Sequence, residues 1–307
     1  MPELPEVQTT VDGIHSRAKG LRIVDVWTDY RSDFHRGKDN VADPRYFSYF
    51  KKTICGARIL RASRRAKNVL IHLDNEQTIL IHMKMTGHVL YGKYKKVGGK
   101  WIATDAGPLR DDPFNRHVRL IFTLSNGKHL ALSDMRRFAK TTLIETKSLH
   151  KSKHLEKSGP EPLDKTFNFS DFKTRLYLRP KGKIKQVIMN HEIIAGIGNI
   201  YSDEILWSAG INPLEQVQNI PEAKLKLAFK AMKKILSHGI NVGGDSMSDY
   251  RNIDGIAGKF QNKHRAYQKT GELCSKKGCT GTIKRIVVGG RSGHYCDTHQ
   301  KIIRIKA

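Results

Sequence analysis

Three cysteines and one histidine near the C-terminus constrain the fold of this chain more than any other feature. Four residues separate Cys274 from Cys279, a spacer of sixteen residues follows, and two residues separate Cys296 from His299. Two close ligand pairs joined by a hairpin-length spacer are typical of a tetrahedral zinc site with three cysteines and one histidine, with unliganded thiols as the alternative. The sequence therefore predicts one structural Zn²⁺. His294 is a rival fourth ligand, but the spacing after Cys296 favours His299.

The spacer between the two ligand pairs has a pattern of its own. Residues 282–288 are typical of a strand, and Gly289-Gly290 can supply the turn of a β-hairpin. Arg291 follows this turn, where it could contact phosphates or be an ordinary solvated arginine. Residues 265–307 are therefore expected to form a zinc-finger hairpin.

The charge of the chain points to a polyanionic partner. The 307 residues contain 55 Lys+Arg against 29 Asp+Glu, a net charge of +26. Residues 221–307 hold 18 Lys+Arg and 6 Asp+Glu, so +12 of this charge lies in the last part of the chain. Apolar runs such as 79–81 are far shorter than the ~20 residues that a membrane span needs, so nucleic acid is favoured over a membrane.

The cysteine usage and the start of the chain indicate a compartment. No basic-then-apolar signal sequence opens the chain, so we expect a cytoplasmic, nucleoid-associated protein. Cysteines in a reducing compartment do not form a disulfide framework. Cys55, far from the other three, is expected to be a buried small apolar residue.

The N-terminal stretch carries a candidate nucleophile. If Met1 is removed, Pro2 becomes a secondary amine beside the carboxylates of Glu3 and Glu6. An α-amino group titrates near ~7.7–8.0, so roughly a tenth of it is neutral at pH 7, against well under a thousandth of a lysine near ~10.4. On these residues alone, a stiff solvated arm leading into a helix is the more economical interpretation.

Apolar spacing predicts a helix over 7–19 and then an antiparallel sandwich or barrel. The segment 91–116, rich in Gly, Lys and Asp, is expected to be a surface excursion, and Ser125-Asn126-Gly127 a hairpin turn. The predicted strands are 21–27, 69–73, 78–83, 118–124 and 129–132.

Beyond a Lys, Ser, Gly and Pro-rich linker at 146–166, the pattern becomes helical. Ser170 is the expected N-cap of the first helix, Gly239 is expected to end the last, and 241–264 is expected to be a mobile loop. The expected helices are 171–178, 183–189, 202–207 and 221–238. The chain is thus predicted to be of the α+β class with three parts, 1–150, 151–264 and 265–307.

Basic residues beside apolar or aromatic ones occur next to two strands. Lys67 ends the cluster that begins at Arg64, and Arg136 and Phe138 follow another strand. Such clusters suit a protein that holds phosphates and inserts a side chain into a base stack, although a charged edge strand has the same pattern. Asn199, after a glycine-rich turn, could contact a phosphate, but helix packing explains that turn equally well. Dinucleotide and P-loop motifs are absent from the sequence, which excludes those nucleotide sites.

Seven ordered motifs together resemble the formamidopyrimidine-DNA glycosylase family, and they extend over nearly the whole chain. They are the Pro-Glu-Leu-Pro-Glu-Val start, 64–67, Met85-Thr86-Gly87, 134–138, 159–163, 195–201 and the Cys-rich finger with 288–291. The resemblance implies an N-terminal helix with a β-sandwich, a helix-two-turn-helix domain and a zinc hairpin. It also implies a monomer that binds double-stranded DNA containing damaged bases in the cleft between its halves.

The resemblance also implies roles for individual residues. Pro2 would attack the sugar C1′, Glu3 would protonate the ring oxygen, and Glu6 would support the amine. Lys67 would hold a phosphate at the lesion and assist elimination. The implied reaction is base excision through a Schiff base, followed by β,δ-elimination.

The remaining implied site residues contact DNA or the metal. Asn199 and Arg291 would clamp flanking phosphates, and Arg291 would thereby take part in catalysis. Met85, Arg136 and Phe138 would fill the gap left by the extruded base, and His117 is a further DNA-binding candidate. This set resembles the oxidised-purine branch, with lesions such as 8-oxoguanine and formamidopyrimidines. An endonuclease VIII-like pyrimidine glycosylase and a non-catalytic zinc DNA-binding protein are the alternatives.

The chain departs from the usual family pattern at several positions. The first cysteine pair has four intervening residues where two are usual, and His299 replaces a fourth cysteine. Lys84 and Met135 stand where glycine and proline are usual, and Asn190-His191 replaces a pair that usually begins with Asp.

Overall fold

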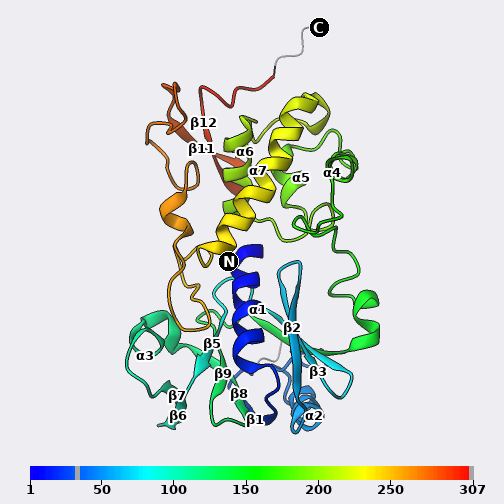
Figure 1. Ribbon diagram of the computed structural model, residues 1–307, viewed down its shortest axis with the longest axis vertical. Coiled ribbons are helices and arrows are strands. Elements are labelled where there is room, and N and C mark those ends of the chain that lie inside the picture. Colours follow the sequence, from blue (N-terminus) through cyan, green and yellow to red (C-terminus); the bar gives the residue numbers. More distant parts are fainter. Residues whose placement is uncertain (32–34, 304–307) are drawn as a thin grey trace. The chain divides into compact units, whose positions relative to one another are not determined.

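The computed structural model describes residues 1–31 and 35–303 and divides into two compact units (Figure 1). Unit 1 contains Met1–Glu156 together with Val242–Lys259. Unit 2 contains Lys157–Asn241 and the described residues from Phe260 onward. No described helix is long and apolar enough to cross a membrane.

Two four-stranded antiparallel sheets form the centre of unit 1, in the orders β1-β8-β9-β5 and β10-β4-β3-β2. Their inward faces share one apolar core that includes Val26, Ile71 and Phe122. The predicted α+β class and antiparallel sandwich are confirmed. The strands are β1 (Ile23–Thr28), β2 (Ile59–Arg65), β3 (Asn68–Leu73), β4 (Gln77–His82), β5 (His88–Gly92), β8 (Val118–Leu124), β9 (His129–Ser133) and β10 (Lys140–Glu145).

Helix α1 (Leu4–Ala18) covers this core and begins three residues earlier than predicted. Its start is a capping box in which the Glu3 and Glu6 side chains accept from each other's backbone N–H groups. Val7, Val11 and Ile14 are buried on its inner face, as their spacing predicts. A second helix, α2 (Pro44–Ile54), was not predicted, although Asp43 caps it with two accepted hydrogen bonds and Pro44 opens it.

The segment 91–116 lies largely at the surface, as expected, but it also has secondary structure that was not predicted. The segment forms the hairpin of β6 (Tyr94–Val97) and β7 (Lys100–Ala103), then α3 (Pro108–Asp111) and the 3-10 helix η2 (Pro113–Arg116). Tyr94, Ala103 and Leu109 pack in an apolar cluster with Leu90 and Ile121 of the sandwich. High polarity hid these few apolar anchors.

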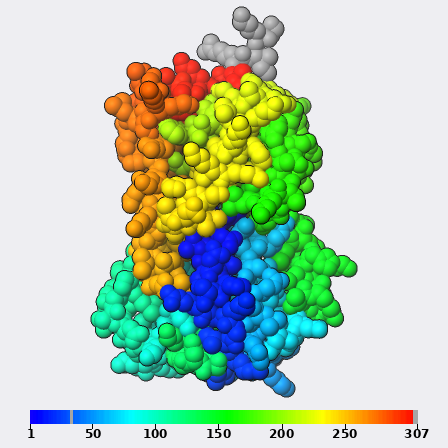
Figure 2. Space-filling model, viewed as in Figure 1, coloured from blue at the N-terminus to red at the C-terminus, as the bar shows by residue number. Residues whose placement is uncertain are grey.

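The expectation of a mobile loop at 241–264, belonging to the second part of the chain, was wrong. Residues 242–259 pack on unit 1, where they lie beside α1 in both the ribbon and the space-filling views (Figures 1 and 2). Ile253 belongs to the sandwich core, and its carbonyl accepts from Tyr91 N at 2.7 Å. It reaches α1 at Gly13, where a Cβ would lie 2.6 Å from the Ile253 side chain. A side chain other than hydrogen at position 13 would therefore force the segment away from the helix.

Unit 2 contains four α-helices among the described residues, followed by the β11–β12 hairpin. Asn168, and not Ser170, caps the first helix by accepting from Asp171 N. The last helix passes through Gly239, which is buried, and ends at Asn241. The elements are α4 (Phe169–Leu176), α5 (Ile184–Met189), α6 (Asn199–Ala209), α7 (Glu222–Asn241), β11 (Ile283–Val288) and β12 (Arg291–Cys296). Short 3-10 helices are η4 (Val217–Asn219) and η5 (Phe260–Lys263) here, and η3 (Thr146–Lys151) in unit 1.

Candidate active site and metal centre

Pro2 and Glu3 are buried directly before α1, so the start of the chain is not a solvated arm. Glu6, only 1% exposed, holds this start in place. Its Oε2 accepts from Glu3 N at 2.7 Å, and its Oε1 accepts from Asp245 N at 2.7 Å. Tyr250 adds a third contact, since its hydroxyl donates to the Glu6 carbonyl at 3.0 Å. The packed segment 242–259 thus orients the candidate nucleophile through one carboxylate.

Lys67 lies in the tight turn between β2 and β3, half-buried. The preceding Ala66 has a left-handed φ of 52°, which is uncommon for alanine. Arg64 stabilises the turn, because its Nη1 donates to Ala66 O at 2.9 Å and its Nε donates to Gln8 Oε1 of α1, also at 2.9 Å. The turn that carries Lys67 is therefore fastened to the helix that begins beside Pro2.

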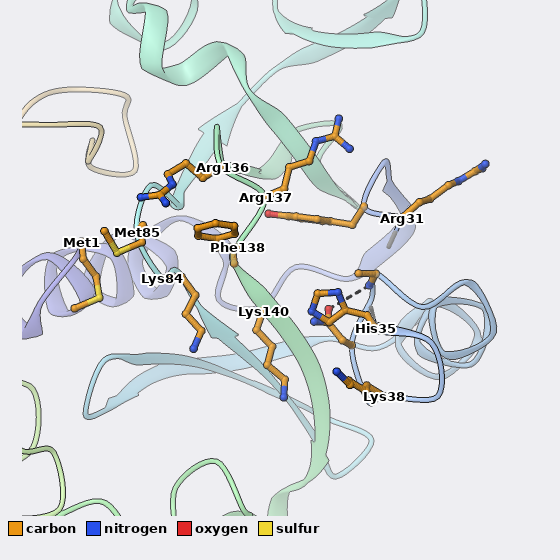
Figure 3. A pocket seen from close by; sticks show the side chains of 14 residues that line it. Met1, Arg31, His35, Lys38, Lys84, Met85, Arg136, Arg137, Phe138 and Lys140 are labelled. Atoms are coloured by element: carbon orange, nitrogen blue, oxygen red, sulfur yellow. Dashed lines mark hydrogen bonds between the residues drawn. The ribbon is translucent and has the colours of Figure 1, made fainter. Parts of the chain in front are cut away.

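Met85, Arg136 and Phe138 come from two loops of unit 1 and line one pocket (Figure 3). Met85 is 41% exposed and Phe138 is 52% exposed, which is unusual for large apolar side chains. The Arg136 guanidinium lies 4.6 Å from the Phe138 ring centroid, a cation–π contact. The fold brings these three side chains, predicted from two separate motifs, together at the surface, and Met135, next to Arg136 in the sequence, is also exposed.

Asp134, to which the sequence motifs assigned no role, joins these two loops. Its fully buried carboxylate accepts from Thr86 Oγ1 at 2.5 Å and from Ala139 N at 2.8 Å. The Tyr30 hydroxyl donates to the same carboxylate at 2.9 Å, and burial together with Asp134 raises the pKa of Tyr30 well above its usual value. His117 precedes β8, and its carbonyl accepts from Asp134 N at 2.8 Å. Because the burial of Asp134 is seen only in the fold, no local sequence pattern pointed to this role.

In unit 2, Asn199 begins α6 and Arg291 begins β12. Asn199 Oδ1 is buried and has no hydrogen-bond partner among the described residues, while Arg291 is exposed after the Gly289-Gly290 turn. Both glycines have positive φ values of 59° and 75°, as a two-residue hairpin turn of this kind requires.

Asp203 docks the hairpin onto the helices. Its carboxylate, fully buried, accepts from Lys185 Nζ of α5 at 2.6 Å. It also accepts from the backbone N–H of His294 at 2.9 Å and lies 2.9 Å from His294 Nδ1. Lys185 Nζ further donates to Asn199 O at 3.4 Å. Asn199 and Arg291 are therefore carried by elements that share one buried carboxylate, another group that the sequence patterns did not reveal.

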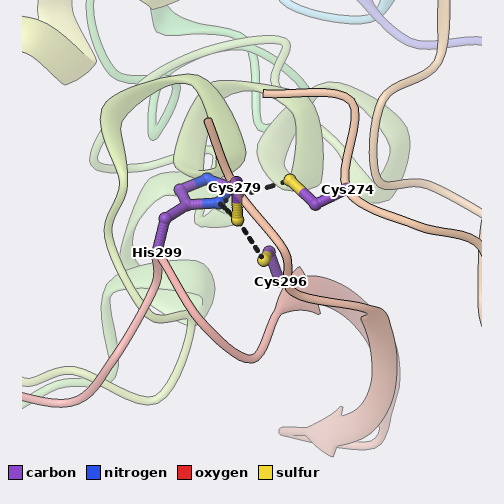
Figure 4. Close-up of side chains that lie close together, drawn as sticks. All are labelled: Cys274, Cys279, Cys296 and His299. Carbon is purple, nitrogen blue, oxygen red and sulfur yellow. Dashed lines mark hydrogen bonds between the residues drawn. The ribbon is translucent and has the colours of Figure 1, made fainter. Parts of the chain in front are cut away.

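The four predicted metal ligands converge in unit 2 (Figure 4). The ligand atoms of Cys274, Cys279, Cys296 and His299 all lie within 4.8 Å of one another. Cys279 Sγ lies 3.5 Å from Cys296 Sγ and 3.7 Å from His299 Nδ1. His294 is excluded from this cluster by its contact with Asp203.

These separations fit a tetrahedral zinc ion. Zn–S bonds of about 2.3 Å and Zn–N bonds of about 2.0–2.1 Å give ligand–ligand edges of roughly 3.5–3.8 Å. The third measured edge, from Cys274 Sγ to His299 Nδ1, is 3.4 Å. His299 presents Nδ1 to the cluster, while its Nε2 lies 3.0 Å from Trp207 O, which is the kind of outer contact that orients a metal-binding imidazole.

Comparisons with known proteins agree with this architecture. Residues 1–141 match the family described as the formamidopyrimidine-DNA glycosylase N-terminal domain, and residues 158–251 match the formamidopyrimidine-DNA glycosylase H2TH domain. A formamidopyrimidine-DNA glycosylase of Herpetosiphon aurantiacus is 34% identical over 300 residues, which cover 98% of this chain and 100% of that protein.

Solved structures are similar as well. The complex between the Lactococcus lactis Fpg and an abasic-site-containing DNA has a TM-score of 0.80 at 29% identity, covering 96% of this chain and 98% of that one. A structure of MutM in complex with carbocyclic 8-oxo-G containing DNA has a TM-score of 0.78 at 30% identity, with the same coverage. The sandwich, the H2TH domain and these matches define a DNA-repair glycosylase. The chain belongs to the formamidopyrimidine-DNA glycosylase family, whose members carry glycosylase and lyase activity.

Proposed function

We propose that this enzyme excises oxidised purines such as 8-oxoguanine and formamidopyrimidines from duplex DNA and then cleaves the strand at the abasic site. The observation that carries the proposal is the buried start of α1, where the Glu6 carboxylate bridges Glu3 N and Asp245 N. An amine at the adjacent Pro2 is held in one orientation instead of moving with a flexible arm. Such orientation supplies much of the rate advantage of a positioned nucleophile.

In the proposed reaction the chain begins at Pro2, after removal of Met1. The lone pair of the Pro2 amine attacks C1′ of the damaged nucleotide, and the C1′–N bond breaks with its electrons passing to the base, which takes up a proton. The attached nitrogen gives up its N–H proton, and its lone pair then forms the C1′=N bond of an iminium as the C1′–O bond breaks onto the ring oxygen, which Glu3 protonates.

The iminium is an electron sink, and it makes strand cleavage possible. Loss of a proton from C2′ expels the 3′-phosphate, and loss of a proton from C4′ then expels the 5′-phosphate. Glu3 is suited to carry these protons, and Lys67, in its fastened turn, is suited to hold a phosphate at the lesion. Water finally hydrolyses the iminium and releases the amine.

The exposed set Met85, Arg136 and Phe138 supports the choice of duplex DNA. A side chain that fills the gap left by an extruded base must project into solvent before DNA binds, as Met85 and Phe138 do. The Arg136 guanidinium, which only donates hydrogen bonds, can also bind the O2 and N3 acceptors of an orphan cytosine, so it suits a lesion opposite cytosine and hence a damaged guanine.

In unit 2 we propose that Asn199 and Arg291 contact phosphates, and that one structural Zn²⁺ is held by the cluster of three cysteines and His299. The metal would stabilise the zinc finger by cross-linking its two ends and would take no part in base excision or strand cleavage. The docking of β12 on Asp203 supports this arrangement, because the arginine needs a fixed hairpin to reach a defined phosphate.

Borohydride trapping on matched duplexes tests this function. We expect a covalent protein–DNA adduct and strand cleavage on a duplex with 8-oxoguanine opposite cytosine, because borohydride reduces the iminium. A duplex that carries an oxidised pyrimidine is the control and should react more slowly. Faster reaction on the pyrimidine duplex would favour the endonuclease VIII-like alternative, and tight binding with no adduct would favour a non-catalytic DNA-binding protein.

Two neighbouring glycines test the role of Glu6. Gly243 and Gly244 both have left-handed φ values, 80° and 83°. A Cβ at Gly244 would lie 2.9 Å from the Glu6 side chain, whereas at Gly243 its nearest neighbour would be Gly258 Cα at 3.6 Å. The left-handed φ should cost each alanine variant about 1–2 kcal/mol of stability, and Gly244→Ala should lose somewhat more because of its contact with Glu6.

Only the Gly244→Ala variant should also move the Glu6 carboxylate, and we expect about 10²-fold slower single-turnover excision from it, since small displacements of a reacting group have effects of that size. Thermal unfolding and excision rates, measured on both variants, separate the two effects. Equal excision rates would refute the positioning role of Glu6.

A further inference from the structure

A basic pocket lies beside the loops that carry Met85 and Phe138, and none of its lysines has a part in the reaction described above. Its volume is about 720 Å³, and its wall includes Met85, Arg136 and Phe138 on one side (Figure 3). On the other side are Lys84 and Lys140, whose side chains extend in the same direction away from Phe138 (Figure 3). The pocket therefore joins the exposed apolar set to a pair of ammonium groups.

The backbone places these two lysines next to each other. Lys140 begins β10 and pairs with His82, the last residue of β4. Lys84 follows two residues after His82, and its N–H donates to His82 Nδ1 at 3.0 Å. Lys84 has a left-handed φ of 54°, a conformation that ordinarily favours glycine. A lysine kept in such a strained position suggests that its side chain is useful there.

The pocket is crowded with positive charge. No carboxylate among the described residues lies within 4.0 Å of the ammonium of Lys84 or of Lys140. Lys140 Nζ lies 3.5 Å from His154 Nε2, and the ammonium of Lys153, which follows Lys140 by thirteen residues, is paired with Asp39 at 3.1 Å.

Ionisation at and around the pocket reflects burial first and this crowding second. Burial, and then the charges of Lys153 and Lys84, lower the pKa of Lys140. Burial and the nearby lysines also lower the pKa of His82 to about 3 and that of His154 to about 4, so both imidazoles are neutral at pH 7. Partly desolvated like charges are unfavourable together unless an anion lies between them. The pocket thus has the electrostatics of an anion site.

We propose that Lys84 and Lys140 bind a backbone phosphate of the DNA strand opposite the lesion. This inference rests on the proposed function, because it takes Arg136 to face the orphan base. Lys140 lies four residues after Arg136, and both residues line the pocket. The orphan base belongs to the strand opposite the lesion, and a residue next to that base lies within one or two nucleotides of the phosphates of the same strand. The ammonium pair is therefore suited to a phosphate of the opposite strand and not of the damaged one. The contact would fix the register of that strand without reading its sequence.

Salt dependence of binding tests whether the lysines hold a phosphate. The ligand is a duplex with a stable abasic analogue, which undergoes no excision. We expect Lys84→Gln and Lys140→Gln together to reduce the slope of log K against log salt by about 1, since each neutralised phosphate contributes roughly 0.9. Lys95→Gln is the matched control, because it removes one exposed lysine on β6, outside the pocket wall, and should leave the slope unchanged. An unchanged slope in the double variant would overturn the proposal.

Lys84→Gly is a second variant, chosen because it should remove the ammonium without destabilising the fold. Glycine accepts the left-handed φ without strain, so the variant should unfold at the same temperature as the wild type or higher. It should still bind the abasic duplex more weakly than the wild type, because one of the two ammonium contacts to the phosphate is lost. A Lys84→Gly variant with the affinity of the wild type would show that the side chain at position 84 does not meet a phosphate.

Methylphosphonate substitution assigns the strand. A neutral methylphosphonate opposite the lesion, or one nucleotide to either side, should weaken wild-type binding but hardly affect the double variant. If instead a methylphosphonate in the damaged strand removes the difference between the two proteins, the strand assignment is wrong. Binding is measured without catalysis, so a failure of borohydride trapping would refute the proposed reaction while leaving these phosphate results to stand or fall independently.

Discussion

No borohydride-trapped adduct is expected from a chain that retains Met1 or carries an added residue ahead of Pro2. The added peptide bond converts the Pro2 amine into an amide, whose nitrogen has no basic lone pair to attack C1′. Trapping on an 8-oxoguanine duplex, with the N-terminal residue of each preparation verified by mass spectrometry, measures this effect. An adduct from the blocked chain would place the nucleophile elsewhere, and Lys67 would be the first residue to examine.

Two further variants divide the role of the N-terminus into its parts. Pro2→Gly keeps a terminal amine and should still be trapped, although more slowly, because a primary amine replaces the rigid secondary one. Glu3→Gln keeps the hydrogen-bonding shape but cannot transfer protons, and we expect a loss of about 10²–10⁴-fold in excision. Tight binding without nicking in the wild type, unchanged in the Pro2→Gly variant, would support the non-catalytic alternative.

Loss of the metal is expected to abolish high-affinity DNA binding while leaving unit 1 folded. Cys296, 0% exposed, is the ligand whose replacement should cost most, since structural zinc contributes about 10–16 kcal/mol in isolated finger peptides. Elemental analysis should find one zinc per wild-type chain and none in Cys296→Ala. Hydrogen exchange should then show an unprotected β11–β12 hairpin and an unchanged sandwich.

The chain provides its own controls for the metal site. Cys55→Ala removes a thiol from unit 1 and should change neither zinc content nor binding. His299→Cys should retain zinc, because a set of four cysteines is also tetrahedral, whereas His299→Ala should weaken it. His294→Ala should retain zinc too but should loosen the hairpin by removing a contact to Asp203. If His294→Ala lost zinc and His299→Ala retained it, His294 and not His299 would be the fourth zinc ligand.

Features with local signals were predictable from the sequence. The spacing of Cys274, Cys279, Cys296 and His299 identified the four side chains that converge, because a hairpin brings both of its ends together whatever the rest of the fold does. Helix α1 and strands such as β8 (Val118–Leu124) were predictable from periodicity, since one buried face imposes a regular apolar spacing.

Local patterns failed where long-range contacts decide the structure. The segment 242–259 has the glycine and polar content of a mobile loop, but its few anchors, Ile253 above all, bind it to α1 and the sandwich. The helix that ends at Asn241 passes through Gly239, which is buried, in spite of the low helix propensity of glycine.

By itself, the sequence determined the set of chemical groups: an amine that Met1 removal could expose, two acids beside it, a basic chain and a finger with three cysteines and a histidine. Only the tertiary structure decided which groups meet. The Glu6 carboxylate finds Asp245 N, Asp134 joins the loops of Met85 and Phe138, and Lys84 comes beside Lys140. Such contacts join residues that are far apart along the chain. Side-chain periodicity reflects only the local burial of one face of a helix or strand, so it does not indicate which distant residue a buried polar group will contact.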